Sequence, residues 1–189
     1  MSIENTEIEN MVAGQEYDFR GYKKFYLNSR KLMTKNFIVR FLAEAFASYS
    51  VLIFVFFGWY IAKTVGGLRI DFLALAAFVL ARFVFVAIIN HFYKRRRPYQ
   101  QFKFIPIHNW LFTYPENGAN SFPSRHTSSM IAISAVLIFY FPLIGLIGLA
   151  LALLAGCARV AMGYHYPSDI FGGIAVGLAS AFIVLAIYK

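Results

Sequence analysis

Polar and apolar positions separate along this chain into long blocks. After residue 36 the apolar residues gather in five segments, at 37–61, 71–93, 127–141, 143–162 and 169–188. A helix that crosses the hydrocarbon core of a bilayer needs about 20 residues. We therefore expect an all-α fold, a bundle of about five membrane-spanning helices. The third segment has only 15 residues and reaches about 22 Å as a helix, so the loop before it is expected to dip below the headgroup level.

The first 36 residues differ from the rest. Residues 1–17 are polar and acidic, and we expect a mobile tail there. Between residues 18 and 36, apolar residues recur at near-helical spacing with cations between them: Phe19, Tyr22, Phe25, Tyr26, Leu32 and Met33. This pattern is typical of a helix that lies in the headgroup layer, although a solvated basic leader would also fit. We divide the chain into a tail with an interfacial helix (1–36) and a membrane-embedded domain (37–189).

The long connection from residue 94 to residue 126 has too few apolar residues in series to span a membrane. We expect it to fold over one mouth of the bundle, with Trp110 and Tyr114 at the interface. Two charges, Glu44 and Arg82, fall inside predicted spans. Charges are costly in hydrocarbon, so both are expected to face the bundle interior. We favour a structural ion pair between them over a catalytic role.

Composition supports a membrane protein. Of the 189 residues, 59% are hydrophobic and 14% are charged, whereas soluble domains have roughly 45–50% apolar residues. These values exclude intrinsic disorder, and the single Cys157 excludes a disulfide scaffold. The net charge is +9. A basic and apolar chain suits anionic headgroups or phosphate, and we expect no nucleic-acid partner because no soluble fold with a basic face is indicated.

Five spans place alternate connections on opposite sides of a membrane. Four polar residues at span ends then emerge on one face: Arg97, His126, Arg159 and Asp169. They belong to three separate polar clusters, each of which suits an anionic phosphoryl group.

The first cluster is Lys94-Arg95-Arg96-Arg97-Pro98-Tyr99. Its cations can neutralise phosphate, and arginine adds a planar pair of donors that holds two oxygens. The alternative is a cationic cap that fixes the orientation of the preceding span.

The second cluster runs from residue 121 to residue 127, with the sequence SFPSRHT. Proline suits the first turn of a helix, and Ser124 can cap it. The free backbone N–H groups of such a helix start bind anions, and His126 could give a proton to a leaving oxygen. The alternative is an ordinary capped helix with an incidental histidine.

The third cluster runs from Arg159 to Asp169. Pro167 interrupts any helix between His165 and Asp169. From the start of the next span, the Asp169 carboxylate could reach back to a His165 ring nitrogen. That bond would fix the tautomer and leave the other nitrogen free to attack. The alternatives are an aspartate that complements a helix dipole and a histidine that faces water.

Together the clusters resemble the three signatures of the type-2 phosphatidic acid phosphatase superfamily. Those signatures read Lys, six residues, Arg-Pro; then Pro-Ser-Gly-His; then Ser-Arg, five residues, His, three residues, Asp. The matching residues here are Arg97-Pro98, then Pro123-Ser124-Arg125-His126, then Ala158-Arg159, His165 and Asp169. Order and separations agree over roughly residues 90–169.

The resemblance implies a lipid phosphatase with defined roles. His165 would be the nucleophile that forms a phosphohistidine, Asp169 would orient it, and His126 would be the general acid. The phosphoryl oxygens would be bound by Arg97 and Arg159, together with Ser124 and the backbone that follows it. We expect no cofactor and no metal, because the cations already serve the electrostatic role and would repel a metal ion. A metal site of His126, His165 and Asp169 has the right ligand types and is the less favoured alternative.

Three positions depart from the signatures: Asn90 stands where lysine is expected, Arg125 replaces glycine, and Ala158 replaces serine. Asn90 can bond an oxygen but brings no charge, so we expect Arg96, Arg95 or Lys94 to substitute for the missing cation. Arg125 would add a phosphate contact or narrow the site. We therefore count Asn90, Arg96 and Arg125 among the substrate-binding candidates.

A site at the bilayer surface implies a lipid phosphate as substrate. We favour undecaprenyl diphosphate, because short bacterial members of the superfamily act on it, over phosphatidylglycerophosphate, phosphatidate or lipid A phosphate. A membrane binding or scaffold protein that lost catalysis through Asn90 is the alternative of another class.

The expected location is a bacterial plasma membrane, with several spans. Outside the spans, and apart from Arg97, Arg125 and Arg159, ten cations fall on the site's face and three on the other, which favours a cytoplasmic site. Bacterial relatives of this kind generally act on the outer face of the inner membrane, which favours that face instead. The sequence makes no prediction of the oligomeric state.

Overall fold

A computed structural model describes residues 17–61, 63–64, 68–101 and 120–188 of the chain. Within these ranges every regular element is a helix, which confirms the all-α prediction. The predicted acidic tail lies outside the described residues, except for its last residue, and so do Trp110 and Tyr114.

The helices follow the predicted segments closely. In chain order they are α2 (Tyr17–Lys35), α3 (Phe37–Ile61), α4 (Leu68–Val79), η2 (Leu80–Phe85), α5 (Val86–Phe92), α6 (Pro98–Gln101), α7 (Arg125–Tyr140), α8 (Pro142–Ala161) and α9 (Pro167–Ile187). The segments α4, η2 and α5 form one continuous rod, in which η2 is a π-helical stretch. Proline opens both α8 and α9, as expected for a residue whose backbone angle suits the first helical turn.

Three helices in the described part of the chain are long and apolar enough to cross a membrane: Arg69–Phe92, Pro142–Ala161 and Pro167–Ile187. Large apolar side chains also point outward from the bundle, among them Phe56, Phe171 and Phe182. Such exposed apolar surface requires a lipid environment. The chain is therefore a helical membrane protein, and the total of five spans stays a prediction. The short segment is α7, whose 16 residues extend about 24 Å.

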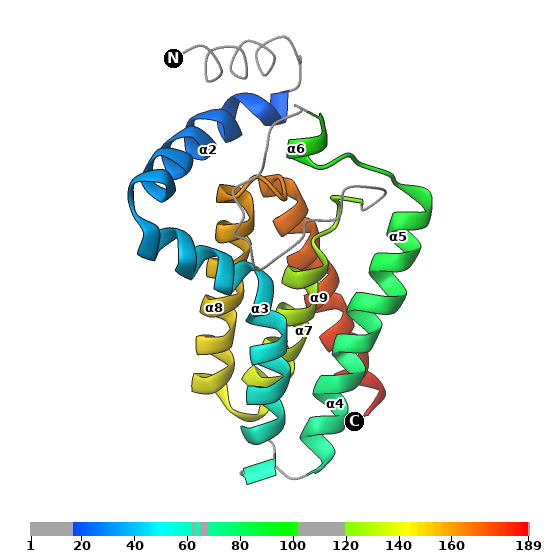
Figure 1. Ribbon diagram of the computed structural model, residues 1–189. Coiled ribbons are helices and arrows are strands. Elements are labelled where there is room, and N and C mark those ends of the chain that lie inside the picture. Colours follow the sequence, from blue (N-terminus) through cyan, green and yellow to red (C-terminus); the bar gives the residue numbers. More distant parts are fainter. Residues whose placement is uncertain (1–16, 62, 65–67, 102–119, 189) are drawn as a thin grey trace, which may run out of the picture.

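Helix α7 runs through the middle of the bundle, with α3, α8, α9 and the α4–η2–α5 rod around it (Figure 1). Its central residues Met130, Ile131 and Val136 are fully buried. The buried hydroxyl of Ser134 donates to the carbonyl of Met130 one turn earlier, at 2.8 Å. A polar group in the core is thereby satisfied within its own helix.

Glycines allow α8 and α9 to approach α7 closely. A Cβ atom at Gly177 of α9 would lie 2.7 Å from the carbonyl oxygen of Ser128, and one at Gly145 of α8 would lie 2.2 Å from the backbone nitrogen of Ile138. Both distances are shorter than van der Waals contact. Small residues at helix contacts are the usual means of tight packing in membranes, where burial of apolar surface between helices gains little.

Helix α2 lies across one end of the bundle (Figure 1). Tyr22, Tyr26 and Met33 are buried in a cluster with residues of the α8–α9 turn, while Phe25 and Leu32 remain 46% and 56% exposed. The predicted helix exists. Part of its apolar face packs on protein, and the position of the exposed part in the headgroup layer stays a prediction.

The predicted ion pair between Glu44 and Arg82 is also wrong. The Arg82 guanidinium donates to the carbonyl of Arg125 and to the hydroxyl of Ser129, both at 3.4 Å. Glu44 instead lies 4.0 Å from Arg40 on its own helix. The reason is that the α4–η2–α5 rod packs mainly against α7, so Arg82 faces the start of that helix.

The close contact of α7 with α9 predicts a sharp effect of side-chain size at Gly177. Gly177→Val places carbon against the backbone of α7 and should destabilise the protein by about 1–3 kcal/mol. Thermal unfolding in detergent measures this loss. Ala179→Val adds volume on the exposed face of the same helix and should leave the melting temperature nearly unchanged. Equal melting temperatures of the two variants would contradict the packing described here.

Candidate active site

The three polar clusters meet at the end of the bundle that α2 covers. The end of α5, α6, the start of α7 and the α8–α9 turn all lie there (Figure 1). The Arg97 guanidinium donates to the carbonyl of Tyr164 at 3.3 Å, which joins the first cluster to the third. The amide of Ser124 donates to the carbonyl of Asp169 at 3.0 Å, which joins the second cluster to the third.

The start of α9 sets the position of Asp169. Tyr166 caps this helix in an extended conformation, and its backbone N–H donates to Asp169 Oδ2 at 2.8 Å. The same oxygen lies 3.3 Å from His165 Nδ1. The carboxylate thus reaches back across Pro167, because a carboxylate in the first helical turn naturally points to the backbone before the helix.

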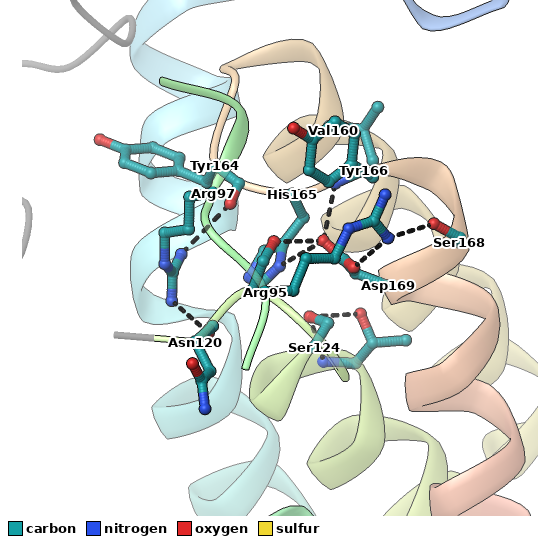
Figure 2. A network of polar contacts seen from close by, with 12 residues as sticks. Arg95, Arg97, Asn120, Ser124, Val160, Tyr164, His165, Tyr166, Ser168 and Asp169 are labelled. Carbon is teal, nitrogen blue, oxygen red and sulfur yellow. Dashed lines mark hydrogen bonds and ion pairs between the residues drawn. The ribbon is translucent and has the colours of Figure 1, made fainter. Parts of the chain in front are cut away.

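Two further side chains bind Asp169, and the sequence did not indicate them as its partners. The hydroxyl of Ser121 donates to Oδ2, and the Arg95 guanidinium lies 3.1 Å from Oδ1. Figure 2 shows Arg95, His165 and Ser168 around the carboxylate. Asp169 is fully buried, so these hydrogen bonds replace the water that it gives up on folding.

His165 is held as a neutral imidazole. Burial lowers the pKa of His165 to about 3, although the hydrogen bond to Asp169 acts in the opposite direction, and Arg159 and Arg97 lower it further. When Asp169 accepts a hydrogen bond from the Nδ1–H group, the lone pair is on Nε2. That nitrogen has no hydrogen-bond partner among the described residues. The geometry therefore leaves a nucleophilic nitrogen available.

Two buried guanidiniums lie beside His165. Arg97 and Arg159 are 4% and 9% exposed and close enough to repel each other. Burial lowers the pKa of Arg97 from its ordinary value, because a buried charge loses its hydration. An anion that entered between the two arginines would offset both their mutual repulsion and the loss of hydration.

The start of α7 supplies a histidine and free backbone donors. Ser124 caps the helix as predicted: its hydroxyl accepts from the Thr127 N–H at 3.4 Å and from the Thr127 hydroxyl at 3.1 Å. The N–H groups of Arg125 and His126 have no acceptor in the described part of the chain, as is usual for the first residues of a helix. The His126 ring lies within electrostatic range of Arg159 and His165, so it belongs to the same pocket.

The remaining predicted residues lie at different distances from this centre. Arg125 is exposed, and its charge is felt by Arg97 and Arg159. The carbonyl of Asn90 accepts from the Asn120 side chain at 2.9 Å, and Asn120 in turn lies against Arg97. Arg96 is exposed, and no hydrogen bond or ion pair joins its side chain to the described site residues. Of the three cations expected to replace the missing lysine, only Arg95 is seen to enter the site.

No group of three histidine, cysteine, aspartate or glutamate side chains in the described ranges is arranged to hold a metal ion. Asp169 Oδ2 is occupied by Ser121, Tyr166 and His165. Among these three residues, the contact that the structure shows is the hydrogen bond between the Asp169 carboxylate and the His165 imidazole.

Comparison with known proteins identifies the family. The PAP2 superfamily matches residues 71–189, the part of the chain that holds all three clusters. The bacitracin transport permease protein BcrC of Bacillus licheniformis is 32% identical over 149 residues, which cover 79% of this chain and 70% of that protein.

Two phosphatases are also similar over shorter stretches. The undecaprenyl-diphosphatase BcrC of Bacillus subtilis is 36% identical over 69 residues, 36% of each chain. The lipid A 1-phosphatase of Rhizobium johnstonii is 33% identical over 106 residues, 56% of this chain and 39% of that protein. No solved structure matches. The chain therefore belongs to the PAP2 superfamily of membrane phosphatases.

Proposed function

We propose that this lipid phosphatase removes the terminal phosphate of undecaprenyl diphosphate through a phosphohistidine on His165. The observation that carries the mechanism is the buried Asp169–His165 pair, whose Nδ1–Oδ2 distance is 3.3 Å and which stands beside Arg97 and Arg159. The substrate is supported by the similarity to the undecaprenyl-diphosphatase of Bacillus subtilis.

The reaction proceeds in two displacements. His165 Nε2 attacks the terminal phosphorus, and the bond from phosphorus to the bridging oxygen breaks. His126, which would be protonated when the anionic diphosphate is bound next to it, gives that proton to the oxygen, and undecaprenyl phosphate leaves. Water then attacks the phosphohistidine, His126 takes a proton from it, and inorganic phosphate and free His165 result. Phosphoryl transfer of this kind depends mainly on positioning and charge stabilisation.

The cations and the α7 start supply that stabilisation. Arg97 and Arg159 would hold the equatorial oxygens, and the free N–H groups of Arg125 and His126 would add backbone donors at a helix N-terminus. The Ser124 hydroxyl is bonded to Thr127, so its contribution would be to fix this helix start. The exposed Arg125 side chain and Asn90 would contact the outer part of the diphosphate.

The location of the site at one end of an apolar bundle suits an amphiphilic substrate. Its phosphate would enter the polar end, and its hydrocarbon tail would remain in lipid. We propose a protein of several spans in a bacterial plasma membrane, with 37–189 as the membrane-embedded domain. Lipid A 1-phosphate is a second candidate, favoured by the similarity to the Rhizobium enzyme.

A substrate panel tests the proposed reaction. Purified protein in detergent micelles with EDTA should release phosphate from undecaprenyl diphosphate faster than from lipid A, phosphatidate or phosphatidylglycerophosphate, and vanadate should inhibit it. Phosphate release is measured directly. Activity that requires added metal would contradict the mechanism, and faster turnover of a monophosphate lipid would contradict the substrate. Binding of these lipids without turnover would instead favour the alternative, a membrane binding protein that lost catalysis through Asn90.

Substitution of the two histidines should have different effects. His165→Ala removes the nucleophile and should abolish both turnover and the acid-quenched phosphoenzyme. His126→Ala should lower turnover by about 10²–10⁴-fold and should spare substrates whose leaving group needs no proton, such as an aryl phosphate. His91→Ala, an exposed histidine of α5, is the control with wild-type rate. Retained turnover in His165→Ala would refute the phosphohistidine.

Burial of neutral His165 also predicts a pH dependence of stability. The folded pKa is about 3 and the unfolded value is about 6.5. As pH falls from 6.5 towards 3, the unfolded chain therefore takes up a proton that the folded protein does not. Stability should fall by up to about 1.4 kcal/mol per pH unit from this group. His165→Gln should show a shallower decline of melting temperature in this window than the wild type or His91→Gln; parallel curves would contradict the assignment.

A further inference from the structure

Arg95 differs from its cationic neighbours in where its charge lies. Lys94 and Arg96 are exposed, whereas the side chain of Arg95 is only 14% exposed. One nitrogen of its guanidinium, Nη1, donates to Asp169 Oδ1 at 3.1 Å and to the Ser168 hydroxyl at 2.7 Å. Its charge is thus directed at the carboxylate that contacts His165.

The guanidinium is also held from its flat side. It lies over the ring of Tyr166, 3.9 Å from the ring centre, in the geometry of a cation–π contact. Tyr166 is fully buried, and its hydroxyl donates to Gln101 at 2.9 Å. The ring of Tyr22 from α2 packs against it with centroids 5.8 Å apart. Arg95 therefore approaches Asp169 from a fixed direction.

The two carboxylate oxygens are used by different partners. Oδ2 accepts from His165, Ser121 and the Tyr166 N–H, while Oδ1 lies against Arg95. Without a partner on Oδ1, the carboxylate could rotate and lose its alignment with the imidazole. We propose that Arg95 is a positioning residue, which holds Asp169 so that Oδ2 faces His165 Nδ1 and the other ring nitrogen faces the phosphate.

This inference rests on the proposed role of His165 as nucleophile, and it adds an electrostatic consequence. Arg95 partly neutralises Asp169 and so limits how strongly that carboxylate favours a protonated His165. The other groups that face His165 are the charged Arg159 of α8 and Arg97 of the preceding loop, and the titratable His126 of α7. They stay in place when Arg95 alone is replaced, so a changed pH profile reports the loss of Arg95.

A second role for Arg95, contact with the substrate phosphate, makes a different prediction. A phosphate-binding arginine acts on KM and on the affinity for vanadate, whereas a positioning residue acts on kcat and on the pH profile. Steady-state kinetics separates the two roles.

The experiment compares Arg95→Gln, Arg95→Lys and a matched control with wild type, on undecaprenyl diphosphate in micelles. Arg95→Gln should lower kcat by about 10–100-fold, leave KM within about threefold, and move the acid limb of kcat/KM up by about one pH unit. Arg95→Lys should recover most of the lost kcat and the original profile, because both hydrogen bonds come from one nitrogen. Arg69→Gln removes an arginine that stacks on Tyr188 at 4.6 Å, far from the site, and should behave as wild type.

Two results would overturn the inference: a wild-type kcat and profile in Arg95→Gln, or a raised KM and weakened vanadate inhibition with both kcat and profile unchanged. Thermal unfolding checks that each variant is folded. If Arg95→Gln does not fold, Arg95→Met takes its place, because its apolar side chain keeps the packing on Tyr166. The same two results would then overturn the inference. Retained turnover in His165→Ala would instead refute the proposed nucleophile. The experiments therefore distinguish a failure of the Arg95 proposal from a failure of the His165 proposal.

Discussion

The hydrogen bonding of the Asp169 carboxylate is the interaction on which the polar end of the bundle depends. Residues from three parts of the chain, Arg95, Ser121 and His165, bind this one buried group. A buried carboxylate without partners would cost several kcal/mol, so each of these segments is fixed by the need to satisfy it. Fold stability and the orientation of the histidine thus have the same physical origin.

The same pocket brings positive groups close together. Arg97 and Arg159 are buried next to a histidine that is neutral at physiological pH. Charges in such a place interact strongly because little water screens them. In the proposed reaction, a phosphoryl group would bring negative charge next to these guanidiniums, and the stabilisation would be greatest in the transition state, where the charge on its oxygens grows. Under that proposal, substrate binding and rate acceleration would both come from the same arrangement of charges.

The sequence predicted the features that have a local or periodic signal. Long apolar runs gave the helices, and a serine before an apolar run gave the cap at Ser124. The signature spacing also identified which side chains gather at one end. The contact of Arg95 with Asp169 spans 74 positions and has no periodic signal, and the same is true of the Ser121 contact. Arg82 was assigned to the wrong partner because hydropathy locates a helix but does not fix which face meets which neighbour.

The π-helical stretch Leu80–Phe85 changes the direction in which side chains point along the α4–η2–α5 rod. In an α-helix each residue turns by about 100°, and a π turn holds an extra residue, so positions after it are out of phase with those before it. The apolar stripe of α4 therefore does not continue in register into α5. Relatives that differ by a single insertion or deletion at this point would present a different side of the last two turns to Asn120 and Arg97, even with every other residue unchanged. A gap in a sequence alignment within this rod therefore changes which way the following side chains point. For the same reason, where Asn90 lies relative to Arg97 depends on how the preceding helix is wound as well as on the number of residues between them.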